Sequence, residues 1–141
     1  MINLGSEFLK MNIRDLMIPS EKVAHVQVGN NLEHALLVLT KSGYTAIPVL
    51  DPNYKLHGLI SMSIIMESIL GLERIEYEKL EQKPVQDVMK KEIPRLKINA
   101  SMPHTLELLV DHSFLCVEDD AGFFEGIITR KFILQLFNDH L

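Results

Sequence analysis

The sequence predicts an α/β fold, of the α+β kind, built from two tandem β-α-β-β-α units. Two observations predict it. The chain contains an internal repeat, and each repeat alternates short apolar runs with one-sided helical patterns separated by turn residues. A length of 141 residues and a hydrophobic content of 47% suit one globular core or two small ones.

The repeat is visible as short motifs that recur in the same order. The matched segments are 13–17 (IRDLM) with 85–89 (VQDVM), 26–28 with 96–98, 48–51 with 116–119, and 57–61 with 125–129. Their separation falls from 72 to 68 residues in two steps, each at a position where a turn is expected. Independent apolar runs would not keep this order, so the chain is a duplicated unit.

The first repeat predicts each element from local signals. A strand is expected over 23–28, followed by a helix with Asn30 as its N-cap and Gly43 after its end. Two strands joined by turn residues follow, over 46–50 and 56–60. A second helix is predicted by the apolar stripe that follows, with Ser61 as its N-cap and Gly71 at its end.

The second repeat follows the same plan. Ser101 is expected to cap its first helix and Thr129 its last, with the hairpin turn at 119–122. Between the repeats, residues 72–83 are charged and lack Gly and Pro, which predicts a partly helical linker. The expected domains are therefore 1–71 with an N-terminal helix, a linker over 72–84, and 85–141.

Composition argues against several classes of function. A net charge of −5 and a pI of about 5.6 give no electrostatic footprint for nucleic acid, and no apolar run is long enough to span a membrane. The start of the chain lacks the pattern of a signal peptide, and Cys116 is the single cysteine, which suits a reducing cytoplasm. No histidine has metal-ligand spacing, so neither a metal nor a cofactor is expected.

Motifs of catalysis are also missing from the sequence. It shows no nucleophile paired with a base, no paired catalytic carboxylates and no Walker loop. These observations argue against an enzyme.

The duplicated unit resembles the CBS domain. The residues that support the resemblance are 85–89 (VQDVM), 43–51 (GYTAIPVLD), 58–61 (GLIS) and 126–129 (GIIT), and it covers about residues 13–138. Two such units form a CBS pair, or Bateman module. More narrowly, residues 22–29 (KVAHVQVG) and 71–76 (GLERIE) resemble the stand-alone cyclic-di-AMP receptors of the DarB type.

The resemblance implies a regulatory module whose two units pack about a pseudo-two-fold axis and leave two clefts. It also implies a disc-like homodimer. The first cleft would be lined by Lys22, Val23, Ala24, Tyr44, Thr45, Ala46, Ile47, Pro48, Thr129 and Arg130. The second would be lined by Ile93, Pro94, Leu96, Phe114, Leu115, Cys116, Ser61 and Met62.

The first cleft combines groups that bind phosphate. Thr129 lies at a helix N-terminus, where unpaired N–H groups favour an anion, and Arg130 adds a bidentate cation. Lys22 would supply a further cation from the opposite wall, and Arg130 is expected to face solvent in the free protein. The second cleft has Ser61 and Met62 at the equivalent positions, so we expect it to be empty or weak.

The remaining residues of the first cleft suit an adenine. Val23 and Ala24 would offer backbone groups to the base edge, and Tyr44 and Ile47 would offer apolar or stacking surface. This set predicts a nucleotide as the ligand.

The identity of that nucleotide depends on a missing carboxylate. Nucleotide-binding CBS units commonly place an Asp three residues after the Ser or Thr, where it holds a ribose cis-diol. Here the equivalent positions are Ile64 and Phe132. A cyclic 3′,5′-linked dinucleotide has no free cis-diol, so the sequence favours cyclic di-AMP over AMP or ATP.

The predicted function is a nucleotide sensor that regulates a partner protein in trans. By resemblance, the partner would be a (p)ppGpp synthetase/hydrolase or pyruvate carboxylase. Two alternatives stay open: a module that senses AMP or ATP, and a ligand-free dimerisation or interaction scaffold. Singly, Lys22 and Arg130 also fit ordinary surface residues, and only their convergence in one cleft favours a ligand.

Overall fold

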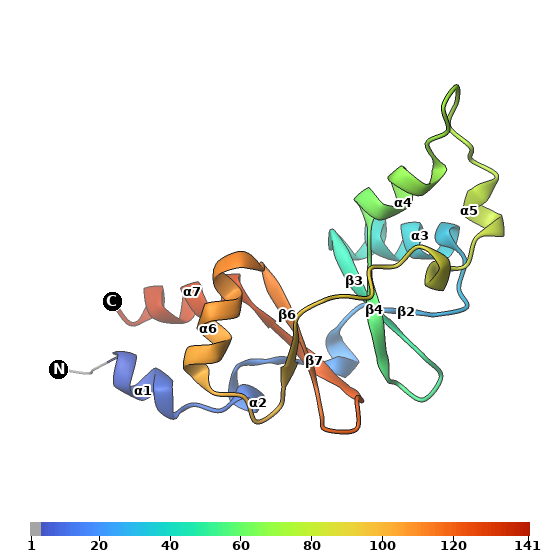
Figure 1. Ribbon diagram of the computed structural model, residues 1–141. Coiled ribbons are helices and arrows are strands. Elements are labelled where there is room, and N and C mark those ends of the chain that lie inside the picture. The colour runs from blue at the N-terminus through green and yellow to red at the C-terminus, as the bar shows by residue number, and fades with distance from the viewer. Residues whose placement is uncertain (1–3) are drawn as a thin grey trace. The chain divides into compact units, whose positions relative to one another are not determined.

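The computed structural model describes residues 4–141 and forms two compact units (Figure 1). Unit 1 contains the chain up to Val23 together with Pro94–Leu141, and unit 2 is Ala24–Ile93. Both units contain a sheet and helices, which confirms the predicted α/β class. Within residues 4–141, no helix combines the length and apolar character needed to cross a lipid bilayer.

Each sequence repeat gives its leading segment to the unit formed by the other repeat. In unit 1, β1 (Ile18–Pro19) pairs antiparallel with β7 (Phe124–Thr129). In unit 2, the backbone groups of Leu59 and Lys90 exchange two hydrogen bonds of 3.0 and 2.9 Å. The compact units divide at 23 and 93. The division at 71 and 84 that the repeats predict stays a prediction.

Two glycines permit this exchange of segments. A Cβ atom at Gly58 would lie less than 3.0 Å from the carbonyl oxygen of Lys90, and one at Gly126 equally close to that of Ile18. Real Cβ atoms do not approach backbone oxygens so closely. The glycine that precedes each helix-capping Ser or Thr by three positions is thus required by the approach of the exchanged segment.

Unit 2 is a three-stranded sheet with helices. Its elements are β2 (Val26–Gln27), α3 (Leu32–Ser42), β3 (Ala46–Leu50), β4 (Leu56–Ser61), α4 (Met62–Ile69), α5 (Lys79–Gln82) and the 3-10 turn η2 (Val85–Asp87). The strand order is β2-β3-β4, with β2 parallel and β4 antiparallel to β3. Residues of α3, β3, β4 and α4 form its hydrophobic core.

Unit 1 is a four-stranded sheet of order β1-β7-β6-β5. Its further elements are α1 (Leu4–Lys10), α2 (Ile13–Leu16), the 3-10 turn η1 (Ser20–Lys22), β5 (Arg95–Lys97), α6 (Met102–Asp111), β6 (Phe114–Glu118) and α7 (Arg130–Asp139). Phe8 of α1 and residues of α2, α6 and α7 pack on the sheet to form the core of this unit.

Two local predictions need correction. The N-cap of α3 is Asn31, whose side chain accepts the N–H of His34 at 2.9 Å, and not Asn30. The Asn30 side chain instead accepts the N–H of Gln27 at 2.7 Å and closes the preceding turn. The strand expected over 23–28 is shorter than predicted, since β2 covers only Val26–Gln27. The expected partly helical linker is confirmed by α5.

Candidate functional site

In unit 2, one end of the sheet collects several of the predicted ligand residues. Because β2 and β3 are parallel, with Val26 opposite Val49, the residues that precede the two strands lie at the same end. These residues include Ala24 and Thr45. The start of α4 reaches the same place, since the N–H of Met62 donates to the carbonyl of Thr45 at 3.1 Å. The geometry therefore groups Ala24 and 44–46 with the N-terminus of α4.

The predicted residues of β3 and the segment before it differ in exposure. Tyr44 is 38% exposed and Thr45 is also exposed, whereas Ile47 and Pro48 are buried. The Ile47 side chain packs in the core of unit 2. A ligand at this end of the sheet would meet the Tyr44 ring and the backbone of Ile47, not the side chain of Ile47.

In unit 1, Thr129 and Arg130 lie where β7 joins α7. The hydroxyl of Thr129 accepts the N–H of Phe132 at 3.1 Å, which confirms it as the N-cap. The N–H of Arg130 donates to the carbonyl of Ser113 at 2.8 Å. The first turn of α7 is thus fixed both to its cap and to the residue before β6.

The Arg130 side chain is bonded within unit 1. Its Nε donates to the carbonyl of Leu109 at 2.8 Å, and its Nη2 donates to that of Val110 at 3.2 Å. These carbonyls belong to the last turn of α6, where helix carbonyls lack partners and a cation is favoured. The expectation that Arg130 faces solvent in the free protein is therefore wrong: it is half-buried and caps a second helix.

These two bonds leave the guanidinium with further donors. A guanidinium has five N–H groups, and two hydrogen bonds from the Arg130 guanidinium to other residues are found in the described part of the chain. The group is held in place by the carbonyls of Leu109 and Val110 and keeps N–H groups for a phosphate oxygen.

Lys22 and Val23 lie at a different part of unit 1. Ile18 is opposite Ile127 and Pro19 is opposite Gly126, so the chain after Pro19 runs toward the β6–β7 turn and not toward Thr129. Lys22 is exposed, whereas Val23 is 6% exposed. Within unit 1 the two predicted cations, Lys22 and Arg130, are therefore not neighbours.

The residues predicted for the second cleft include a buried thiol. Cys116 is 1% exposed on β6, and burial raises its pKa to about 12. The thiolate, which is the reactive form, is therefore absent at neutral pH. In the described part of the chain, no group of three or more acidic, histidine or cysteine side chains is arranged to hold a metal ion.

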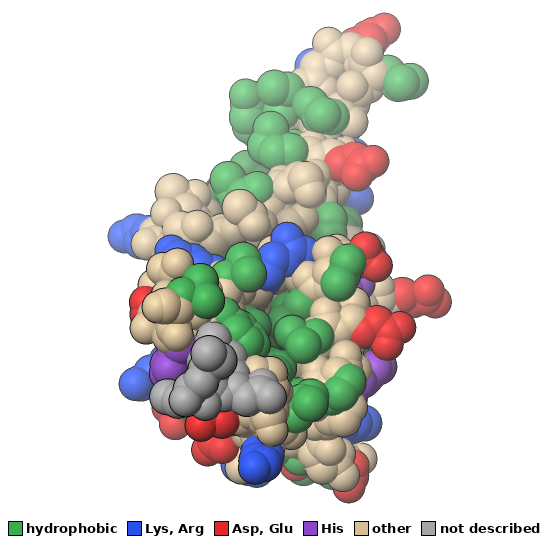
Figure 2. All heavy atoms as spheres, turned by 90° about the vertical axis from the view of Figure 1, so that its left-hand side faces the viewer, with side chains coloured by type: hydrophobic (Ala, Val, Ile, Leu, Met, Phe, Trp, Pro, Cys, Tyr) green, Lys and Arg blue, Asp and Glu red, His purple; other side chains and the backbone are tan. Residues whose placement is uncertain are grey.

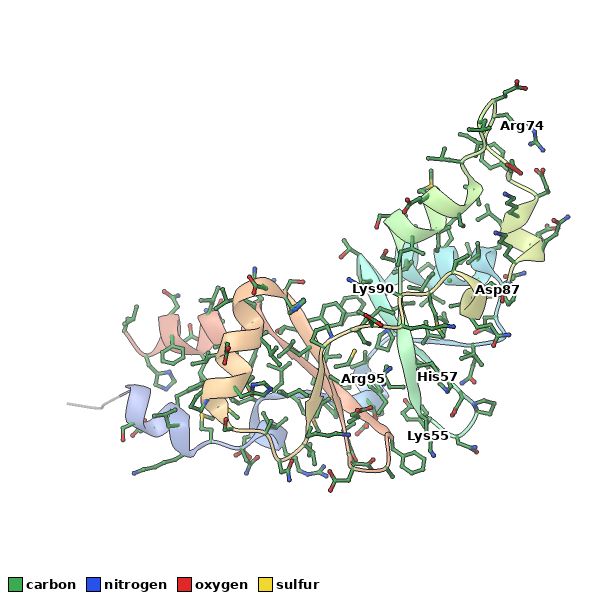
Figure 3. The ribbon with its side chains drawn as sticks, in the orientation of Figure 1. Lys55, His57, Arg74, Asp87, Lys90 and Arg95 are labelled. Carbon is green, nitrogen blue, oxygen red and sulfur yellow. The ribbon has the colours of Figure 1, made fainter. Side chains whose placement is uncertain are left out.

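Sequence reasoning missed a charged cluster beside Cys116. Arg95 of β5 (Figure 3) is opposite Cys116 in the sheet, and its Nη1 donates to a carboxylate oxygen of Glu118 at 3.2 Å. The Nζ of Lys97 donates to the same carboxylate at 3.1 Å, and Glu118 is only 6% exposed. The residues predicted for the second cleft thus have the cations Arg95 and Lys97 nearby. The available signal was the alternation of Arg95 and Lys97 around the buried Leu96.

Comparison with known proteins gives consistent matches. The family model of the CBS domain matches residues 13–71 and again 85–137. The chain is 56% identical over 142 residues to cyclic di-AMP receptor B of Bacillus subtilis (strain 168), covering 100% of this chain and 97% of that protein.

Solved structures also match over most of the chain. A CBS domain-containing protein of unknown function from Bacillus anthracis has a TM-score of 0.89 at 59% identity, covering 97% of this chain and 99% of the other. The CbpB protein of Listeria monocytogenes in complex with c-di-AMP has a TM-score of 0.86 at 55% identity, covering 91% and 96% of the two chains.

Proposed function

This chain belongs to the CBS-domain family, as a pair of CBS domains, and from that premise we propose that it is a receptor for cyclic di-AMP that regulates a partner protein. The observation that supports the proposal is the start of α7, where Thr129 caps the helix and the Arg130 guanidinium is held by the carbonyls of Leu109 and Val110. It is supported by a full-length relative at 56% identity that is named a cyclic di-AMP receptor. A related structure at 55% identity contains c-di-AMP.

The phosphate would bind at the N-terminus of α7. The positive end of the α7 dipole favours negative charge there. The guanidinium of Arg130 is already oriented by the carbonyls of Leu109 and Val110, so little side-chain freedom is lost when it contacts an anion.

The base would bind to the residues grouped at the end of the sheet of unit 2. Tyr44 supplies an exposed ring, and Ala24 and Ala46 supply backbone groups close to it in the chain or sheet. As the resemblance to CBS pairs implies, we propose that these residues bind the same ligand as Arg130, with Lys22 contacting a different part of that ligand.

The structure also bears on the choice between nucleotides. Ile64 and Phe132 have apolar side chains that cannot accept a hydrogen bond from a ribose hydroxyl, and both lie in the first turn of their helices. No carboxylate stands there to hold a ribose cis-diol. Cyclic di-AMP, whose 3′ oxygens are esterified, does not need one, which favours it over AMP and ATP.

The output would be delivered to another protein in trans. We propose a (p)ppGpp synthetase/hydrolase or pyruvate carboxylase as the target, a homodimer as the functional form and the cytoplasm as its location. No catalytic role is proposed. A module for AMP or ATP and a ligand-free scaffold are the competing functions.

Calorimetry with a panel of cyclic di-AMP, cyclic di-GMP, AMP, ATP and S-adenosylmethionine tests the proposal. Cyclic di-AMP should bind most tightly, at one site per chain. Thr45→Tyr should abolish binding by filling the space beside Tyr44, whereas Thr40→Tyr, at another exposed threonine, on α3, should bind like wild type. Two sites per chain or tighter binding of AMP would contradict the proposal, and no heat from any ligand would favour the scaffold.

A further inference from the structure

The end of α4 and the loop between α4 and α5 expose large apolar side chains. Leu72 is fully exposed at 106%, and Met66, Leu70 and Tyr77 are 41%, 56% and 62% exposed. Figure 2 shows hydrophobic side chains gathered at the upper end, at the height where Figure 1 draws α4 and the loop after it. Single exposed apolar residues are ordinary, but a group on one projection marks an interaction site.

The loop is held in one conformation by its own contacts. The N–H of Gly71 donates to the carbonyl of Arg74 at 2.8 Å, and the N–H of Glu76 donates to that of Ile69 at 2.6 Å. A Cβ atom at Gly71 would lie less than 3.0 Å from the Arg74 carbonyl oxygen and from the Glu76 carboxylate, so the turn requires glycine. Leu72 is therefore presented by an ordered loop, and binding would not have to pay to order it.

The loop is also acidic. Residues 67–81 contain five glutamates and two cations, a net charge of −3 out of −5 for the chain. Arg74 lies near the tip of the loop (Figure 3). Both cations are used inside the loop region, because Arg74 pairs with Glu78 and Lys79 pairs with Glu76. The remaining glutamates are exposed and have no ion pair with any described residue: Glu67, Glu73 and Glu81.

We propose that residues 66–78 are the surface with which this protein docks on its regulatory partner. Leu72 would insert into an apolar pocket of that protein, and the glutamates would face lysines or arginines on the rim of the pocket. This inference rests on the proposed function, because it assigns the surface through which the receptor acts in trans.

The charge selects this occupant over others. An acidic loop is repelled by anionic lipid headgroups and by nucleic acid. A contact that placed the loop of one copy against the loop of another would bring two net charges of −3 together. A protein with a basic rim around an apolar pocket satisfies both features of the loop.

Binding of purified probes tests the inference. The probes are the (p)ppGpp synthetase/hydrolase and pyruvate carboxylase of the same organism, measured by biolayer interferometry. Leu72→Asp should weaken binding to the true partner at least tenfold, whereas Leu141→Asp, at a leucine that is 94% exposed in unit 1, should not. Glu73→Lys should weaken it at low salt, with a smaller effect at high salt because the charges are screened.

Two further measurements separate this inference from the function itself. Leu72→Asp should bind cyclic di-AMP within twofold of wild type by calorimetry and keep its mass by light scattering. If Leu72→Asp binds the probe like wild type, or wild type binds neither probe, the docking surface is wrong while cyclic di-AMP binding still stands. A changed mass would assign the loop to self-association and overturn the inference. Loss of cyclic di-AMP binding by wild type would instead refute the proposed function.

Discussion

The helices α4 and α7 begin with the same hydrogen-bond frame, meaning a capping hydroxyl and a bonded first N–H, but their first side chains differ. Ser61 and Thr129 each cap their helix by accepting the N–H three residues later, at 3.2 and 3.1 Å. The next residue is Met62 in unit 2 and Arg130 in unit 1, and its N–H donates in both units to the residue before the neighbouring strand. Both units therefore have this hydrogen-bond frame, but only unit 1 has a positive charge at the first helical residue.

This difference shows how a duplicated unit gains a specific site. Caps, strand pairing and the glycines at 58 and 126 are needed for folding, so they are the same in both units. The first helical residue is not needed for the frame. Met62 is 37% exposed, whereas Arg130 is bonded to the last turn of α6. A change at one residue therefore alters the chemistry of one half without altering its fold.

Substitution of the two equivalent glycines should have the largest effect, which is on stability. Gly58→Ala and Gly126→Ala each place a Cβ atom against a backbone oxygen, and we expect each to lower the free energy of unfolding by about 3 kcal/mol. Urea denaturation measures it. Gly29→Ala is the control, with no atom within 4 Å of its Cβ and an expected change below about 0.5 kcal/mol. If only one of the two glycine variants lost this much stability, the close backbone approach would not be a requirement that both units share.

Removing the charge should affect the ligand next most strongly. Arg130→Ala deletes a charge-assisted phosphate contact, so cyclic di-AMP should bind about 1.5 to 3 kcal/mol more weakly, roughly ten- to a hundredfold. Met62→Ala, at the equivalent position, should bind like wild type. Calorimetry distinguishes them. The opposite result, with Met62→Ala impaired and Arg130→Ala intact, would move the ligand to the other set of residues.

Local signals in the sequence predicted most of this frame. An N-cap depends on a side chain and an N–H three residues away, so Ser61, Ser101 and Thr129 were identified correctly. The CBS resemblance is confirmed as well. At Asn30 and Asn31 two adjacent residues can both cap, and the choice depends on which of them closes the turn at Gln27. A local pattern cannot decide between them.

Contacts distant in sequence were not predicted. The bonds of Arg130 to Leu109 and Val110 span 21 and 20 residues and depend on how α7 lies beside the end of α6. The exchange of leading segments likewise depends on pairing between Ile18 and Ile127, which no spacing reveals. Which residues contact the ligand stays a prediction, because the predicted cleft includes residues from both units.

The contacts of Arg130 predict a moderate effect on stability. Arg130→Ala leaves two carbonyls at the end of α6 without a donor, and we expect a loss of about 1 kcal/mol in the free energy of unfolding. Met62→Ala should lose less than about 0.5 kcal/mol, since Met62 is exposed. Urea denaturation without ligand measures both. Amide exchange should quicken in the last turn of α6, and an unchanged rate there would show that the capping contacts are unimportant.

The hairpin turns of the two units differ in a smaller way. Asp51 accepts the N–H groups two and four residues later at 2.8 and 3.0 Å, and Asp119 does the same at 2.9 Å for both. Asp51 also pairs with His57 at 2.9 Å. The equivalent of His57 is Glu125, which instead lies 3.8 Å from Arg14.

The smallest predicted effect is therefore confined to the turn of unit 2. The hydrogen bond from His57, followed by the backbone N–H of Lys55, lowers the pKa of Asp51 from its usual value of 3.8. An aspartate whose pKa is lowered on folding stabilises the fold above its usual pKa, and this contribution is lost as the pH falls through the lowered value. His57→Gln should raise the pKa of Asp51 toward 3.8 and make stability less sensitive to acidification below that pH. Carboxyl-carbon NMR titration measures the pKa, and Glu125→Gln, the matched change in the other turn, should leave it unchanged. An unchanged pKa of Asp51 in His57→Gln would mean that the His57 contact does not set it.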